Sequence, residues 1–478
     1  MSLNSFLFIT FFLVFFFIYW ILPRSSRNGW LLLANAGFCS LWDWRLLFLL
    51  ATSITVDYFI GLKIGSLNVQ GNKAKPVRKK LLIVSLSTQL LMLGFFKYFN
   101  FFSESLSYFL SRLSIPISPL HLSLILPVGI SFYTFKTMTY TLDIYYRRLD
   151  PTRSFVAYAC YVSFFPAFLS GPIDRAKSLL PQILSERVLL RENILEGAHL
   201  IFLGLFKKIF VADNLAPSVQ HLFSLAHPNG WEVLLGAVLF YFQLYADFSG
   251  YTDIATGCAR CLGFRLTLNF NLPYLARNPV DFWQRWHVSL STWLRDYLFL
   301  PLGGAFRTPI IAYRNLAITM LLAGLWHGPL LTFFLWGGYF AVLLIGYRIL
   351  QPGLKRWGRT VRRFLRKGFC RSVKILMTFL LISLGWVIFR AGSWSTLKTM
   401  ARGLLHWPAG PSPTIILKLC LFAGPLIILE VLEKSVLEGS IYRTNRLSFW
   451  AKTVVYAILF YLWAFNGASA QSFIYAQF

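Results

Sequence analysis

The sequence is poor in charge, and above all in negative charge. Only 13% of its 478 residues are charged, and 46 Lys and Arg stand against 18 Asp and Glu, so the formal net charge is +28. A soluble domain averages about 25% charged residues, whereas 56% of this chain is hydrophobic and Phe alone occurs 47 times. The composition excludes an ordinary soluble domain and predicts an integral membrane protein.

The sequence also lacks the patterns that bind metals or phosphates. The six Cys are scattered, and the single Cys-x-x-Cys at Cys258 and Cys261 has no second pair. There is no His-x-x-x-His, no glycine-rich phosphate loop and no Gly-x-Ser-x-Gly. We therefore predict no bound metal and no resident cofactor.

The basic residues crowd into gaps between apolar runs, which indicates membrane topology rather than nucleic-acid binding. The positive-inside rule places segments 63–80 and 355–374 in the cytoplasm. Counting spans onward from the second segment puts the tail segment, residues 471–478, on the outer side. Basic loops attract anionic headgroups, so we expect membrane lipid, and no nucleic acid, as a partner.

Apolar runs of about 20 residues, enough to span a bilayer, recur along the chain. Several are short or broken, so we expect about 10–12 transmembrane helices with some re-entrant or interfacial helices. We predict an all-α polytopic membrane protein with a single integral-membrane domain, residues 1–478, and no internal repeat. The candidate runs are 3–22, 29–42, 46–62, 81–102, 117–146, 155–173, 194–215, 232–256, 309–326, 329–350, 375–392, 413–432 and 453–470.

Residues 281–297 have the spacing of one amphipathic helix. Its apolar wall includes Trp283, and Ser291 falls on its polar wall with His287 at the edge. Asp281 and Arg285 are one turn apart and can pair. The pattern fits a helix that lines a polar cavity and fits equally an interfacial helix anchored by its aromatic residues.

A second histidine, His327, stands in Gly324-Leu-Trp-His-Gly with no charged residue nearby. Burial favours the neutral imidazole, which is a suitable general base for a hydroxyl group. The alternative is a structural histidine bonded to a backbone carbonyl. Trp326 could shape a cavity beside it or simply pack.

Further polar residues interrupt apolar runs: Asp247, Ser249, Asn271, Lys207 and Lys208. Each alone is explained by structural pairing. Together they predict a polar path through the protein, because polar groups at membrane depth are costly.

Several segments of the chain, taken in sequence order, resemble the motifs of the membrane-bound O-acyltransferase (MBOAT) family, and within it the alginate O-acetylase branch. The resemblance covers 127–135, 165–175, 207–213, 247–251, 269–274, 281–304 and 324–328. It implies the MBOAT fold, a ring of tilted helices around a thin centre with a through-membrane tunnel, and 127–340 as the catalytic core region. It also implies that His327 is catalytic and that His287 supports substrate binding or catalysis. The sequence departs from the family pattern at Ala246, at Ala305-Phe306 and at Pro329, which bears on substrate shape.

The implied function is an O-acyltransferase of the bacterial cytoplasmic (inner) membrane. It would move an acetyl group from cytoplasmic acetyl-CoA across the membrane for O-acetylation of an extracellular or periplasmic, alginate-like polysaccharide. Lys207 and Lys208 would meet the donor phosphates. The expected tunnel and substrate lining is Trp326, Asp247, Ser249, Asn271, Trp283, Arg285 and Ser291.

Two alternatives stay open. One is D-alanyl or other acyl transfer to a cell-wall polymer such as teichoic acid or peptidoglycan. The other is a non-enzymatic transporter, which the absence of inverted repeats disfavours.

The tail sequence Phe473-Ile-Tyr-Ala-Gln-Phe478 resembles a C-terminal motif of the export branch of this family. The resemblance implies that Tyr475 accepts the acyl group transiently and passes it to an extracellular or periplasmic partner protein. The alternative is a hydrophobic tail that only packs.

Overall fold

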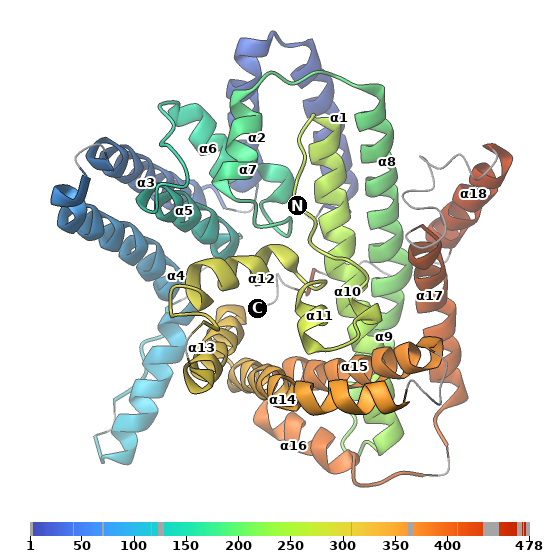
Figure 1. Ribbon diagram of the computed structural model, residues 1–478. Helices are drawn as coiled ribbons and strands as arrows, with labels where there is room; N and C mark the ends of the chain where they lie inside the picture. Colours follow the sequence, from blue (N-terminus) through green and yellow to red (C-terminus); the bar gives the residue numbers. More distant parts are fainter. Residues whose placement is uncertain are drawn as a thin grey trace. The chain divides into compact units, whose positions relative to one another are not determined.

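The computed structural model is mainly helical in the residues that it describes and contains no β-strand there (Figure 1). This confirms the all-α prediction. The described residues are 3–41, 43–68, 71–115, 117–122, 129–306, 308–361, 367–408, 410–433, 449–465, 471 and 473–474.

The chain divides into two compact units, and the division crosses helices α8 (Arg191–Leu205) and α10 (Gly230–Cys261). Unit 1 comprises Met1–Ile201 and Thr252–Thr267, and unit 2 comprises Phe202–Tyr251 and Leu268–Phe478.

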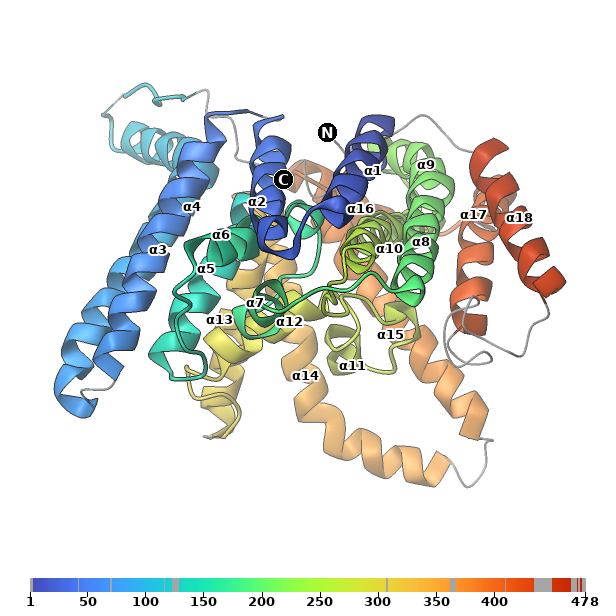
Figure 2. The same ribbon diagram turned by 90° about the horizontal axis from the view of Figure 1, so that it is seen from above.

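In unit 1, the antiparallel helices α3 (Leu46–Asn68) and α4 (Lys75–Arg112) lie side by side in both views (Figure 2). A buried carboxylate joins them: Asp57 of α3 accepts hydrogen bonds from Ser85 Oγ at 2.7 Å and from Gln89 Nε2 at 3.1 Å, both of α4. These bonds offset the cost of burying a carboxyl group in an apolar interior. The helices that begin in unit 1 are α1 (Phe6–Ile21), α2 (Arg27–Ser40), α3 (Leu46–Asn68), α4 (Lys75–Arg112), α5 (Ile130–Tyr145), α6 (Phe155–Ser163), α7 (Ala176–Leu184) and α8 (Arg191–Leu205), with 3₁₀ turns η1 (Arg24–Ser26), η2 (Gly71–Ala74) and η3 (Phe165–Ala167).

In unit 2, α13 (Pro309–His327) and α14 (Leu331–Val361) form a close hairpin because glycines let their backbones touch. A Cβ atom on Gly324 would lie 2.2 Å from the Phe333 carbonyl oxygen, and one on Gly337 would lie 2.4 Å from that of Met320. The helices that begin in unit 2 are α9 (Asp213–Ser224), α10 (Gly230–Cys261), α11 (Pro279–Trp283), α12 (Val288–Leu294), α13 (Pro309–His327), α14 (Leu331–Val361), α15 (Lys367–Arg390), α16 (Trp394–Gly403), α17 (Pro413–Val431) and α18 (Phe449–Phe465), with the π-helices η4 (Phe206–Ala212) and η6 (Arg295–Phe299) and the 3₁₀ turn η5 (Pro273–Leu275).

Among the residues that the structure describes, seven helices are long and apolar enough to cross a membrane, and three shorter helices are also apolar. The long segments are Leu46–Asn68, Lys75–Arg112, Gly230–Cys261, Pro309–His327, Leu331–Gly353, Gly368–Arg390 and Pro413–Val431; the shorter ones are Phe6–Ile21, Phe155–Ala167 and Trp450–Phe465. The predicted polytopic membrane fold is confirmed. The ring arrangement and the tunnel stay predictions.

Candidate active site

The segment that carries His287 is broken, so the prediction of one helix over 281–297 was wrong. Helix α11 ends at Trp283, α12 begins at Val288, and His287 between them has φ +41°. Positive φ is unfavourable for a residue with a Cβ atom and is often found where a side chain must be aimed. The break therefore places the imidazole at a turn and not on the face of a continuous helix.

A short non-helical segment, residues 269–271, holds this turn in place. The amide of Val288 donates to the carbonyl of Asn269 at 2.9 Å, and the amide of Asn271 donates to the carbonyl of Arg285 at 2.9 Å. These bonds replace the helical bonds that the break removes.

The side chain of Asn269 fixes the tautomer of His287. The Asn269 Oδ1 atom lies 3.0 Å from His287 Nδ1 and also accepts from Ser289 Oγ at 2.9 Å. An amide oxygen only accepts, so Nδ1 carries the proton and Nε2 carries the lone pair. Burial lowers the pKa of His287 from 6.5 to about 3, so the ring is neutral at physiological pH.

Trp326 brings the two predicted histidines together. Its ring centroid lies 6.2 Å from that of His287 and 5.0 Å from that of His327. His327 is the last residue of α13, is 4% exposed, and packs edge-on against Trp336 and Phe389, each at 5.1 Å. Within unit 2, two imidazoles that the sequence suggested separately thus share one aromatic wall.

Several predicted lining residues support the His287 turn. Arg285 pairs with Asp281 at 2.8 Å, as expected from their spacing, and also donates to the carbonyl of Asn271 at 3.1 Å. Ser291 Oγ donates to the carbonyl of Trp286 at 3.1 Å. These contacts give Arg285, Asn271 and Ser291 a clear structural role beside the imidazole. Trp283 packs against Trp336 and Phe340, and Ser249 is buried in α10.

Lys207 and Lys208 are buried in ion pairs within unit 2. The ammonium of Lys207 pairs with Glu430, and that of Lys208 lies 2.8 Å from Asp213 and 2.8 Å from Asp247. Both ammonium groups are already neutralised inside the protein. The geometry therefore gives no support to the donor-phosphate role that the sequence suggested for them.

Comparison with known proteins identifies the family. The family model of MBOAT, the membrane-bound O-acyltransferase family, matches residues 145–385. The chain is 39% identical to the probable alginate O-acetylase AlgI of Azotobacter vinelandii over 82% of this chain and 74% of that protein. It is 33% identical to the peptidoglycan O-acetyltransferase of Helicobacter pylori, over 96% and 94% of the two chains. It is 28% identical to the teichoic acid D-alanyltransferase of Bacillus subtilis, over 57% and 71%.

The chain belongs to the MBOAT family. It is a multi-pass membrane protein and an O-acyltransferase, as its sequence predicted.

Three residues of this MBOAT site were not predicted as site residues: Asn269, Asp213 and Glu430. The first two lie within segments that carry the family resemblance. Asn269 lies two residues before the predicted Asn271, so the Asn-Phe-Asn pattern was a usable signal. No sequence pattern indicated Glu430, since it lies in an apolar run far along the chain from Lys207. Tyr475 lies outside the described residues.

The described part of the MBOAT chain contains no group of three or more His, Cys, Asp or Glu side chains placed to hold a metal ion.

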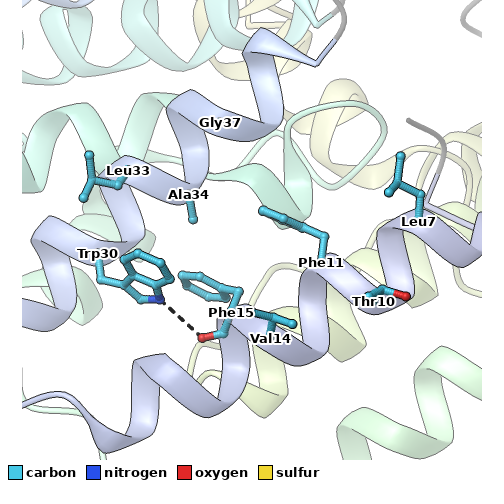
Figure 3. Close-up of a pocket in the computed structure, with 9 residues that line it drawn as sticks. All are labelled: Leu7, Thr10, Phe11, Val14, Phe15, Trp30, Leu33, Ala34 and Gly37. Carbon is cyan, nitrogen blue, oxygen red and sulfur yellow. Dashed lines mark hydrogen bonds between the residues drawn. The ribbon is translucent and has the colours of Figure 1, made fainter.

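A groove of about 390 Å³ lies between α1 and α2 of unit 1 and is not suited to acid–base catalysis (Figure 3). Within it, Trp30 Nε1 donates to the carbonyl of Phe15 at 3.3 Å. Its lining has no acid or base and consists of Leu7, Thr10, Phe11, Val14, Phe15, Trp30, Leu33, Ala34 and Gly37.

Proposed function

We propose that this enzyme moves an acetyl group from cytoplasmic acetyl-CoA to a hydroxyl on the outer side of the bacterial cytoplasmic membrane, for O-acetylation of an extracellular or periplasmic polysaccharide. The observation that carries the proposal is the shared contact of His287 and His327 with Trp326. The similarity to an alginate O-acetylase and to a peptidoglycan O-acetyltransferase supports an acetyl group and a polysaccharide acceptor.

In the proposed reaction, His327 is the general base. It takes the proton of the attacking hydroxyl while the oxygen bonds to the thioester carbonyl carbon. The tetrahedral intermediate then collapses, the carbon–sulfur bond breaks, and the thiolate of coenzyme A takes the proton from the imidazolium. The products are the acetyl ester and free coenzyme A, and His327 is neutral again.

His287 has a different proposed role because its Nδ1 proton is used by Asn269. Its Nε2 can accept a hydrogen bond from the acceptor hydroxyl but cannot donate one to an oxyanion. We therefore assign it the orientation of the hydroxyl, with Trp326 as the lining residue between the two rings.

The proposed first acceptor is Tyr475. The two residues before it are described: Phe473 lies 6.0 Å from Phe248, ring to ring, and Phe248 stands edge-on to His287 at 4.7 Å. The chain thus enters the surroundings of His287 just before position 475. A partner protein on the outer side would then pass the acetyl group from the tyrosine to the polysaccharide.

Labelled acetyl-CoA tests the proposal with the full chain in membranes. We expect mass spectrometry to find an acetyl ester on Tyr475, to find none in His327→Ala, and to find it unchanged in His121→Ala, a histidine exposed in unit 1. Labelling that persists in a well-inserted His327→Ala protein would exclude the base assignment. Labelling by a D-alanyl carrier-protein thioester in place of acetyl-CoA would favour the activity named for the Bacillus relative.

A further inference from the structure

Lys208 lies at the centre of a buried cluster that includes part of the tail segment. Its Nζ is 2.8 Å from Asp213 Oδ1, 2.8 Å from Asp247 Oδ1 and 2.9 Å from the Gln471 carbonyl oxygen. We call Lys208, Asp213 and Asp247 the Lys208 clamp. All three side chains are 1% exposed.

The clamp by itself carries an excess of negative charge. One ammonium faces two carboxylates, and a buried excess charge is costly unless further donors meet it. The backbone of the tail segment supplies such a donor: Ile474 N–H donates to Asp247 Oδ2 at 2.8 Å. The Gln471 carbonyl oxygen accepts from the Lys208 ammonium at 2.9 Å. The tail thus meets the Asp247 carboxylate and the Lys208 ammonium with main-chain groups.

An aromatic slot beside the clamp receives the side chain between these two residues. The ring of Phe473 lies 4.3 Å from Tyr251 and 6.0 Å from Phe248, both on α10. Phe473 and Ile474 are only 7% and 8% exposed. The combination of main-chain bonds and one aromatic anchor is how proteins bind extended peptides.

We propose that the Lys208 clamp is a binding site for the chain's own tail segment, which it holds through the backbone at residues 471 and 474 and through the ring at 473. The site fixes the register of the chain at the residue before Tyr475. The consequence for acetyl transfer rests on the proposed function, whereas the binding itself does not. The two adjacent lysines then have separate partners: Lys208 contacts the tail segment, whereas Lys207 pairs with Glu430 of α17.

Cysteine labelling of the full chain in detergent tests the binding. Ile474→Cys is introduced into a chain with Cys370→Ser and Cys420→Ser, because the other four cysteines are buried. A maleimide reaches position 474 only when the tail opens, so its rate follows the open population. Asp247→Ala removes a hydrogen bond to a charged group and leaves a neutral Lys208–Asp213 pair, so we expect labelling roughly ten- to a hundred-fold faster. Val238→Ala, nine residues earlier on α10 and half-buried, is the control and should leave the rate unchanged.

A second pair of variants leaves the clamp intact. In a Phe473→Cys background, Ile474→Pro removes the donated N–H, whereas Ile474→Val keeps it. We expect faster labelling with proline only. Equal rates for Asp247→Ala and its parent, or for the proline and valine variants, would overturn the proposal.

Acetyl transfer in the single variants separates this proposal from the function. We expect Ile474→Val to be active and Ile474→Pro to lose acetylation of Tyr475. Fast labelling together with full activity of Ile474→Pro would overturn the presentation of Tyr475 by the clamp. Unchanged labelling together with lost activity would overturn the clamp and leave the acetyltransferase proposal standing.

Discussion

At the residue scale, the hydrogen bond between Asn269 and His287 decides what the imidazole can do. It places the proton on Nδ1 and so makes Nε2 an acceptor. Ser289 Oγ donates to the same amide oxygen at 2.9 Å and keeps that amide from rotating. A pair of neutral side chains thus achieves what a carboxylate often does for a catalytic histidine, without adding a buried charge.

The neutrality of His287 makes stability depend on pH. Burial lowers the pKa of its imidazolium from 6.5 to about 3. Between these values the unfolded chain binds a proton that the folded chain does not, so the free energy of unfolding falls as pH decreases below 6.5. We expect wild type to lose about 1 kcal/mol more stability than His287→Asn between pH 7.5 and 5.5.

Thermal unfolding in detergent at the two pH values measures this effect, with each protein serving as its own reference at pH 7.5. Equal pH dependence of the two proteins would show that the folded His287 takes up a proton like an exposed histidine.

At the scale of elements, two devices position the site within unit 2. The π-helix η4 carries Lys207 and Lys208 to different carboxylate partners, and such helices are frequent at functional sites. The glycine contacts between α13 and α14 fix the end of α13, where His327 lies. Packing of backbone on backbone leaves little freedom for that residue.

Two adjacent glycines of α14 allow the effect of backbone packing to be separated from the effect of helix propensity. A Cβ at Gly337 would lie 2.4 Å from the Met320 carbonyl oxygen, whereas one at Gly338 has no neighbour closer than 3.9 Å. We expect Gly337→Ala to destabilise the protein by about 1–3 kcal/mol, as in overpacked cores, and to lower acetyl transfer.

Gly338→Ala is the control, and its higher helix propensity should stabilise the protein by up to about 1 kcal/mol without loss of activity. Melting temperatures and transfer rates of the two variants test this. If Gly337→Ala and Gly338→Ala behaved alike, the close backbone contact assigned to Gly337 would be wrong.

At the scale of the whole molecule, a buried ion cluster ties α17 to the rest of unit 2. Glu430 pairs with Lys207 and accepts hydrogen bonds from Tyr245 at 2.8 Å and Tyr274 at 2.7 Å. Every partner lies far from α17 in the sequence. The cluster therefore determines which part of unit 2 this helix packs against.

We expect Glu430→Ala to cost about 3–5 kcal/mol, because it leaves the Lys207 ammonium buried without its carboxylate. The double variant Lys207→Met with Glu430→Leu removes both charges and should recover most of that loss. A double-mutant cycle of thermal unfolding measures the coupling. Strictly additive effects would show that the two side chains do not depend on each other.

The sequence by itself determined the class of the fold. Few charges and repeated apolar runs require helices, because a helix satisfies its backbone hydrogen bonds inside the bilayer. It also predicted the contact of Asp281 with Arg285, which depends only on local spacing, and it indicated the family through the order of its motifs.

Only the tertiary structure decided how the site is built. Local periodicity favoured a continuous helix through His287, but bonds from residues 269–271 break it there. The basic character of Lys207 and Lys208 suggested a phosphate ligand, yet carboxylates from α9, α10 and α17 neutralise both. The periodicity of a sequence depends on contacts within one helix. The partner of a buried charge depends instead on which distant segment packs against it in the folded protein.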